Sequence, residues 1–192
     1  LQGKVDIGRF HYGLWNLDKV EVNGSYGGGL LVLDNLNLVA NGGRVLLRNK
    51  MEVPIPFKAE PAVFQLRLEN ARFEDFAGDL RKDVNNLRLR LDGMINARLE
   101  FAETAGKVRL STISLKPDVK VSDLELNNQT WGKVRPYRRV FKTQPFQLNG
   151  NIGIRHGQLN VSDTKFVFAT GTLSVSGTHT GSGYDLSGSS SS

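Results

Sequence analysis

The 192-residue chain contains no cysteine and no uninterrupted apolar run long enough to cross a membrane. Without cysteine it has neither a disulfide framework nor a thiolate metal site. Without a long apolar run, no segment is predicted to span a membrane as a helix. Because the chain begins with Leu1 rather than Met, we expect it to be part of a longer protein in which any membrane anchor lies elsewhere.

Sequence patterns typical of catalysis and metal binding are also missing. His11, His156 and His179 have no second ligand at i+2 or i+4, so no metal site is predicted. The acidic residues between Glu74 and Asp83 are typical of charges at a helix start. No serine lies in a G-x-S-x-G elbow, and Gly27–Gly29 lacks the lysine of a phosphate loop. We therefore predict no enzyme and no cofactor, and a hydrolase only if acid, base and nucleophile converge in one cleft.

The composition favours strands and turns. Apolar residues make up 39% of the chain and glycine 21 residues, which suits strands with one face in water. The net charge of +6 raises nucleic acid or anionic lipid as partners. Arg67, Arg88, Arg90 and Arg98, however, occupy the polar side of predicted strands, and no aromatic side chains alternate with them for base stacking. We predict no nucleic-acid partner.

The most regular stretch is Leu87–Phe101. Seven of its eight odd positions are apolar and six of its seven even positions are polar, which predicts a strand with one apolar face. Asp92-Gly93 as a two-residue turn would place apolar beside polar residues on both faces. The pattern leaves open one long strand that bends at Gly93 or two strands joined by an odd-length loop.

Other segments predict further strands and turns. Asn41-Gly42-Gly43 predicts a tight turn joining a strand over Leu30–Ala40 to one over Arg44–Val53. Three further segments are predicted as loops or turns, and they are Asn23–Gly29, Lys116–Asp118 and Ser162-Asp163. From Gly177 onward glycine and serine dominate, and residues 181–192 are predicted to be a disordered tail after a single domain of residues 1–180.

Two segments depart from the alternation. Phe73, Phe76, Ala77 and Leu80 lie at i, i+3, i+4 and i+7, which predicts one short amphipathic helix over Phe73–Leu80. The irregular segment Asn127–Thr143 combines cations with aromatic rings, a pattern that suits lipid head groups, although a plain exposed loop fits as well. The candidate head-group contacts are Trp131, Arg135, Tyr137, Arg138 and Arg139.

So many apolar strand faces exceed what one short helix can cover. The remainder must pack against another sheet, curl on itself or meet an external apolar ligand. A closed β-sandwich acting as a binding module is the simplest of these arrangements. The pattern does not choose among the three.

Four segments resemble the AsmA/TamB-like superfamily of diderm envelope proteins. They match that family's glycine hairpin, its strand leading into a short helix, its long amphipathic strand and its closing glycine-punctuated strands. The segments cover about half of the chain, and they are Leu33–Val53, Val63–Leu80, Val84–Phe101 and Gln147–Thr178. The segment Asn127–Thr143 has no counterpart in the family's pattern.

The resemblance implies a mainly β fold, an antiparallel sheet curled into a groove (a β-taco) with an apolar concave face. It also implies a periplasmic protein, tethered to the inner membrane, that carries phospholipid to the outer membrane. The alternative is a chaperone-like scaffold for outer-membrane β-barrel proteins. The predicted lipid-binding residues are Val45, Leu47, Phe64, Leu66, Leu68, Leu87, Leu89, Leu91, Ile95, Leu99, Phe101, Phe146, Leu148 and Ile152. Their expected partners are the acyl chains of phospholipids.

Overall fold

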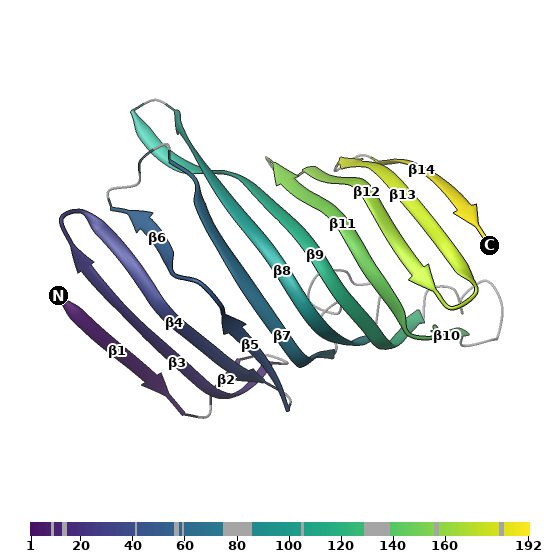
Figure 1. The fold of residues 1–192 in the computed structure, drawn as a ribbon, viewed down its shortest axis with the longest axis horizontal. Helices are drawn as coiled ribbons and strands as arrows, with labels where there is room; N and C mark the ends of the chain where they lie inside the picture. The colour runs from purple at the N-terminus through teal and green to yellow at the C-terminus, as the bar shows by residue number, and fades with distance from the viewer. Residues whose placement is uncertain are drawn as a thin grey trace.

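A computed structural model of the chain consists of antiparallel strands arranged side by side in one open sheet (Figure 1). It describes residues 1–8, 10–12, 15–40, 42–55, 58, 60–74, 86–104, 106–128, 139–155, 158–180 and 183–192. The main path of the sheet follows the order β1-β3-β4-β5-β7-β8-β9-β11-β12-β13-β14. The N-terminus and the C-terminus lie at opposite ends of this path (Figure 1).

Successive strands of the main path are neighbours in the sheet. The first seven are β1 (Gln2–Ile7), β2 (Phe10–Tyr12), β3 (Trp15–Gly27), β4 (Leu30–Ala40), β5 (Gly43–Leu47), β6 (Met51–Pro54) and β7 (Ala62–Glu74). The others are β8 (Asn86–Thr104), β9 (Lys107–Asn128), β10 (Arg139–Lys142), β11 (Phe146–Arg155), β12 (Gln158–Phe168), β13 (Gly171–Thr180) and β14 (Gly183–Ser191). The short strands β2, β6 and β10 pair off the main path with β3, β4 and β9. The prediction of a mainly antiparallel β protein is confirmed.

The central strand β8 settles the choice that the sequence left open. It is one continuous strand of 19 residues, and Gly93 adopts a φ of 141° within it. A Cβ atom at this position would clash with the carbonyl oxygen of Asp118 and lie 2.8 Å from the Cα of Val119 on β9. Glycine is therefore required here by both the backbone angle and the close approach of the neighbouring strand.

β-Bulges keep the apolar residues of the long strands on one face. On β7 the register shifts between Leu68 and Ala71, and on β9 it shifts between Ser122 and Glu125. Each extra residue reverses the alternation of the residues that follow it. Along β7 the apolar residues therefore change from even-numbered to odd-numbered positions, and along β9 they change from odd-numbered to even-numbered positions. Asn70, Asp123 and Asp163 lie at three such shifts with φ of 49°, 55° and 50°. Asn and Asp tolerate this left-handed conformation better than other side chains.

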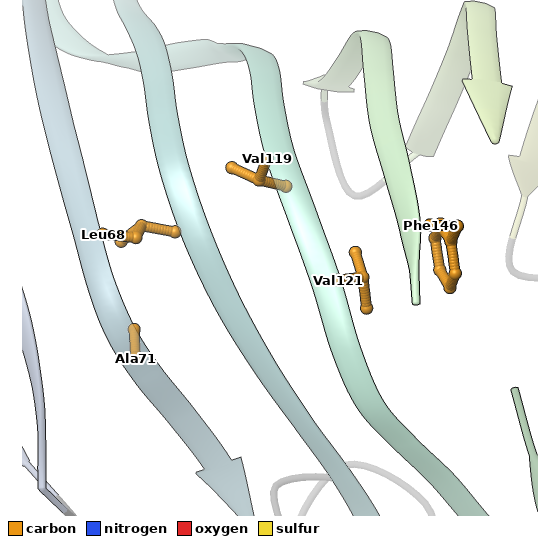
Figure 2. Packing of buried hydrophobic residues seen from close by; sticks show 5 residues of the cluster. All are labelled: Leu68, Ala71, Val119, Val121 and Phe146. Atoms are coloured by element: carbon orange, nitrogen blue, oxygen red, sulfur yellow. The ribbon is translucent and has the colours of Figure 1, made fainter. Parts of the chain in front are cut away.

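The buried core lies in the middle of the sheet. Leu68 and Ala71 come from β7, Val119 and Val121 from β9, and Phe146 from the start of β11 (Figure 2). The ring of Phe146 packs against those of Phe166 and Phe168 on β12, with centroid separations of 5.7 Å and 5.0 Å. The partly buried side chains that pack around this cluster are Val45, Leu89, Leu91, Ile95, Leu124, Leu148, Phe166 and Phe168.

The predicted helix over Phe73–Leu80 is wrong at its start. Strand β7 continues to Glu74, and residues 75–80 lie outside the described part of the chain. Of the four apolar residues at helical spacing, Phe73 alone lies in the described part of the chain. Phe73 pairs with Leu89 as a strand residue instead.

Three predicted loops and turns are also strand in whole or in part, although Gly28 and Gly29 form a turn as predicted. Asn23–Gly27 belongs to β3, where Gly24 allows the carbonyl oxygen of Val32 to approach to within 2.5 Å of where a Cβ would be. Pro117 lies inside β9 and pairs with Ile95. Its missing N–H is tolerated because the β9–β11 ladder has no pairing between Leu115 and Asp118. The predicted turn at Ser162-Asp163 is a bulge within β12.

The glycine- and serine-rich tail is ordered in the structure, contrary to the prediction. Strand β14 covers Gly183–Ser191 and pairs along its length with β13, from Thr180 opposite Gly183 to Thr172 opposite Ser191. Backbone hydrogen bonds form the ladder whatever the side chains are. Without β14, this edge of β13 would have unpaired backbone groups. Residues 181 and 182 lie outside the described part.

Ion pairs lie along the polar face of the sheet. Four of them join residues two apart on one strand, the spacing that places side chains on the same face. The pairs are Lys4 with Asp6, Lys19 with Glu21, Arg67 with Glu69 and Arg98 with Glu100. Because all are substantially exposed, their role is to keep this face solvated rather than to stabilise the fold strongly.

One of these pairs predicts a measurable pH dependence. Lys19 Nζ lies 2.6 Å from Glu21 Oε1, and the amide of Asn37 donates to Glu21 Oε2 at 2.8 Å. The hydrogen bonds from Lys19 and then from Asn37 lower the pKa of Glu21 below its ordinary value of 4.5. The stabilisation of the fold by the ionised Glu21 carboxylate is therefore complete above pH 4.5. It is lost as the pH falls through the lowered pKa of Glu21. We expect the ¹³C-NMR titration midpoint of the Glu21 carboxylate to lie below 4.5.

The matched variant for this measurement is Asn37→Ala. It removes one donor and should move the Glu21 midpoint upward while leaving Lys19 in place. A wild-type midpoint at or above the ordinary value of 4.5 would contradict the hydrogen-bonded arrangement.

Candidate functional site

An unbroken row of paired residues crosses the whole sheet, one from each strand of the main path. Cross-strand partners point to the same face, so the row defines one face of the sheet. In order from β1 to β14 its members are Ile7, Val20, Leu38, Val45, Leu68, Gly93, Val119, Leu148, Phe166, Leu173 and Ser190. All but Gly93 and Ser190 are large apolar residues. We call this side of the sheet the apolar face.

The fourteen residues predicted to bind lipid lie on β5, β7, β8 and β11. The register brings them together in lines on the apolar face. The aligned sets are Val45 with Leu68, Leu47 with Leu66 and Ile95, Phe64 with Ala97, Leu115 and Ile152, and Leu91 with Val121 and Phe146. Leu148 belongs to the row above, and Leu89, Leu99 and Phe101 share the alternation of Leu91 on β8. The backbone of Leu87 is in β8, but its side chain lies outside the described part.

The predicted lipid-binding residues leave out several strands that extend this face. Val20 and Leu38 continue it toward β1, and Phe166 and Leu173 continue it toward β14. On β9 the missed residue Val119 is the most deeply buried of the row, at 1% exposure. The alternating pattern of the β9 segment VKVSDLEL predicts a strand with one apolar side. Only the pairing between strands shows that this side belongs to the apolar face.

The apolar face is buried at its centre and open toward both ends. Val119 and Leu68 are 1% and 4% exposed, whereas Leu173 is 39% exposed. Of the exposed large apolar side chains in the described residues, only Val63 and Val167 lie on the polar face. Those that the alternation places on the apolar face are Leu1, Val5, Ile7, Tyr26, Ile55, Leu110, Ile154, Leu173 and Leu186. The face therefore offers apolar surface that the described residues do not cover.

A cavity of about 210 Å³ lies on this face beside β1. Its lining includes Leu1 and Val5, with Val22 and Tyr26 from β3 and Leu33 from β4. The hydroxyl of Tyr26 donates to the carbonyl oxygen of Ile55 at 3.5 Å. The lining is mostly apolar and can hold an apolar group, and its side-chain hydroxyl groups come from Ser25 and Tyr26.

The candidate head-group contacts cannot be placed on this face. Trp131, Arg135, Tyr137 and Arg138 lie outside the described residues. The backbone of Arg139 begins β10 and pairs with Asn128, while its side chain is not described.

Within the residues that the structure describes, no three His, Asp or Glu side chains come together as a metal site. The described part also contains no helix long and apolar enough to cross a membrane. In comparisons with known proteins, no family model, curated protein or solved structure matches the chain.

Proposed function

We propose that this chain is a non-enzymatic β-groove domain that shelters the acyl chains of phospholipids on its apolar face. In the full protein it would act in the periplasm, tethered to the inner membrane, and support outer-membrane biogenesis by lipid transport. The observation that carries the proposal is the apolar row that crosses every strand of the main path. The compartment and the cargo rest on the resemblance to the AsmA/TamB-like superfamily.

Burial on a single sheet supports a concave apolar face. The described strands all belong to one sheet, so they form no closed sandwich and provide no second layer over Leu68 or Val119. These side chains are nevertheless 4% and 1% exposed. On a flat sheet, neighbours on the same face leave the outward side of each residue open to water. Curling the sheet toward the apolar face brings those neighbours over one another and accounts for the burial.

The energetics suit a carrier that holds lipid without a specific site. Burying each CH₂ of a tail contributes about 0.8 kcal/mol, so a tail gains enough to leave water. A tail spans roughly half of a hydrocarbon core of about 30 Å, or about three strand spacings. Because the row repeats an apolar residue at nearly every strand, a tail can move along it between similar positions.

Two exposed residues on adjacent strands provide a matched test. Leu173 on β13 lies on the apolar face and Val167 on β12 lies on the polar face, at 39% and 38% exposure. We expect a photo-crosslinking residue at position 173, but not at 167, to capture a phospholipid labelled on its acyl chain. Leu173→Asp should weaken binding of that lipid about tenfold or more, because unpaired charge in apolar surroundings is unfavourable.

Val167→Asp is the control, and both variants should keep the β-sheet circular dichroism spectrum of the parent. Equal crosslinking from positions 167 and 173, or equal binding by the two folded Asp variants, would show that the apolar face is not the lipid site.

A scaffold for outer-membrane β-barrel proteins is the second candidate. It is favoured by the two edge strands, because in the described part neither β1 nor β14 has a strand on its outer side. An open edge can pair with an extended segment of a client protein. In that case an unfolded β-barrel protein, rather than the labelled phospholipid, would be captured, and it would be captured from the edge strands.

A further inference from the structure

Three arginines meet on the polar face where β7, β8 and β9 run together. Arg72 on β7 is directly opposite Arg90 on β8, and Arg88 lies two residues before Arg90 on the same face. Like charges directly opposite each other on paired strands are destabilising. Since arginine stays protonated in proteins, this grouping needs negative charge beside it.

Two of the three described acidic residues near the arginines are engaged with other groups. Asp92, the next residue on this face of β8, accepts the backbone N–H of Asn70 at 2.6 Å. Glu125, opposite Arg88 on β9, pairs with Lys142 at 3.0 Å. Asp123 is the one described acid that pairs with any of the three, at 3.5 Å from Nη2 of Arg90.

Arg90 is also held in position by a neutral partner. Its Nε donates to the hydroxyl of Ser122 at 3.0 Å, and Ser122 is buried at 4% exposure. Among the described side chains, Arg72 and Arg88 have no acidic partner. Glu74 lies opposite Arg88 in the register, and its side chain is not described. Asp92 does not line the cavity at this cluster. Even with Glu74 counted, the remaining acids Asp123, Glu125 and Glu74 number one fewer than the four cations Arg72, Arg88, Arg90 and Lys142.

Other arginines on the same face show the usual arrangement. Arg67 and Arg98 each pair through Nε with a glutamate two residues later, both at 2.9 Å. At Arg88 the residue two positions later is Arg90. The position that holds a glutamate after Arg67 and Arg98 therefore holds a further cation after Arg88.

A cavity of about 270 Å³ lies at this cluster, lined by Arg72, Arg88, Leu89, Arg90, Asp123 and Glu125. A water molecule in the liquid occupies about 30 Å³, so the cavity accepts a group much larger than one water. Guanidinium groups bind phosphate oxygens through paired N–H donors. The cavity thus combines room, donors and two cations without a described acidic partner.

We propose that this cavity is a binding site for a phosphate monoester group, held by Arg72, Arg88 and Arg90. Such a group carries about −1.5 to −2 charges at neutral pH, and it would lie beside Arg72 and Arg88, which pair with no described acid. The site lies on the polar face and does not depend on lipid tails occupying the apolar face. The head group of phosphatidic acid is such a monoester, and inorganic phosphate carries the same kind of oxygens and a similar charge without the ester bond.

The test measures binding of inorganic phosphate to the purified chain by calorimetry at constant ionic strength. Arg72→Gln and Arg88→Gln should each weaken phosphate binding about tenfold, the effect of losing one charge-assisted contact. Arg98→Gln is the matched control, since it removes the same charge from the same face of β8 outside the cavity, and it should leave the affinity unchanged. Phosphate should also raise the melting temperature of the parent but not of Arg72→Gln.

The fold of each variant can be checked without phosphate, where relief of the Arg72–Arg90 repulsion should leave Arg72→Gln at least as stable as the parent. Equal losses in all three variants would mean general charge attraction, and would overturn the site. Absence of binding to both phosphate and phosphatidic acid vesicles would overturn it too.

Flotation with vesicles of phosphatidylcholine, with and without phosphatidic acid, distinguishes the sources. Binding to phosphatidic acid vesicles that needs Arg72 and Arg88, with weak binding of free phosphate, identifies a lipid head group as the ligand. Arginine-dependent binding of free phosphate without flotation identifies a soluble phosphate compound. Both results support the site, and neither depends on the outcome of the Leu173 and Val167 comparison.

Discussion

Replacing Gly93 with alanine should destabilise the sheet by about 3 to 5 kcal/mol, from the combined cost of backbone strain and overpacking. The added Cβ would meet the Asp118 carbonyl oxygen and the Cα of Val119, and the φ of 141° is one that side chains rarely adopt. Both effects separate β8 from β9 at the buried centre of the apolar face. Urea denaturation followed by circular dichroism measures the change in unfolding free energy.

Gly153→Ala is the matched control for this substitution. Gly153 lies on β11, has no strained φ, and its nearest neighbour to a new Cβ is 3.9 Å away. We expect this variant to be about 0.5 kcal/mol more stable, because alanine reduces the freedom of the unfolded chain. Similar losses in the two variants would indicate a general need for glycine in the strands rather than the close approach at Gly93.

Truncating Phe146 to alanine should reduce the unfolding free energy by about 3 to 5 kcal/mol. The ring is 7% exposed and packs at 5.0 Å and 5.7 Å, between centroids, from those of Phe168 and Phe166. It connects the cluster on β7 and β9 to the strands of the C-terminal part. Loss of the ring should therefore weaken β11–β14 first, which hydrogen exchange resolved along the sequence can detect.

Val63→Ala provides the comparison for Phe146. Val63 lies on the polar face and is 53% exposed, so its truncation should change stability by only about 0.5 kcal/mol. A loss for Phe146→Ala no greater than that for Val63→Ala would mean that the aromatic group does not hold the two parts of the sheet together.

The strands of the middle of the sheet could be predicted because their side chains alternate strictly. β8 shows this best, with apolar residues at odd positions from Leu87 to Phe101. The alternation fails as a guide where a bulge changes its phase. On β7 the apolar positions change from even to odd numbers at Asn70, and at Asp163 a polar pair resembles a turn within β12.

The candidate sites differ in how far the sequence could define them. The apolar residues of β5, β7, β8 and β11 follow from alternation alone. Their continuation through Val119 and Leu173 requires the pairing of strands, which a single sequence does not specify. The arginine cavity is less predictable still, since Arg72 and Arg90 are 18 positions apart and meet only through the register of β7 and β8.

The serial connection of the strands makes the length of the apolar path adjustable in units of hairpins. Eleven strands of the main path, about 4.8 Å apart, give a path of roughly 48 Å. Adding or removing one hairpin changes that path by about 10 Å. Every other strand keeps its direction and the residues it places on the apolar face. An odd number of strands would instead reverse the direction of all that follow. A protein built this way can lengthen or shorten its apolar face by gaining or losing hairpins, without any change in the sequence of the other strands.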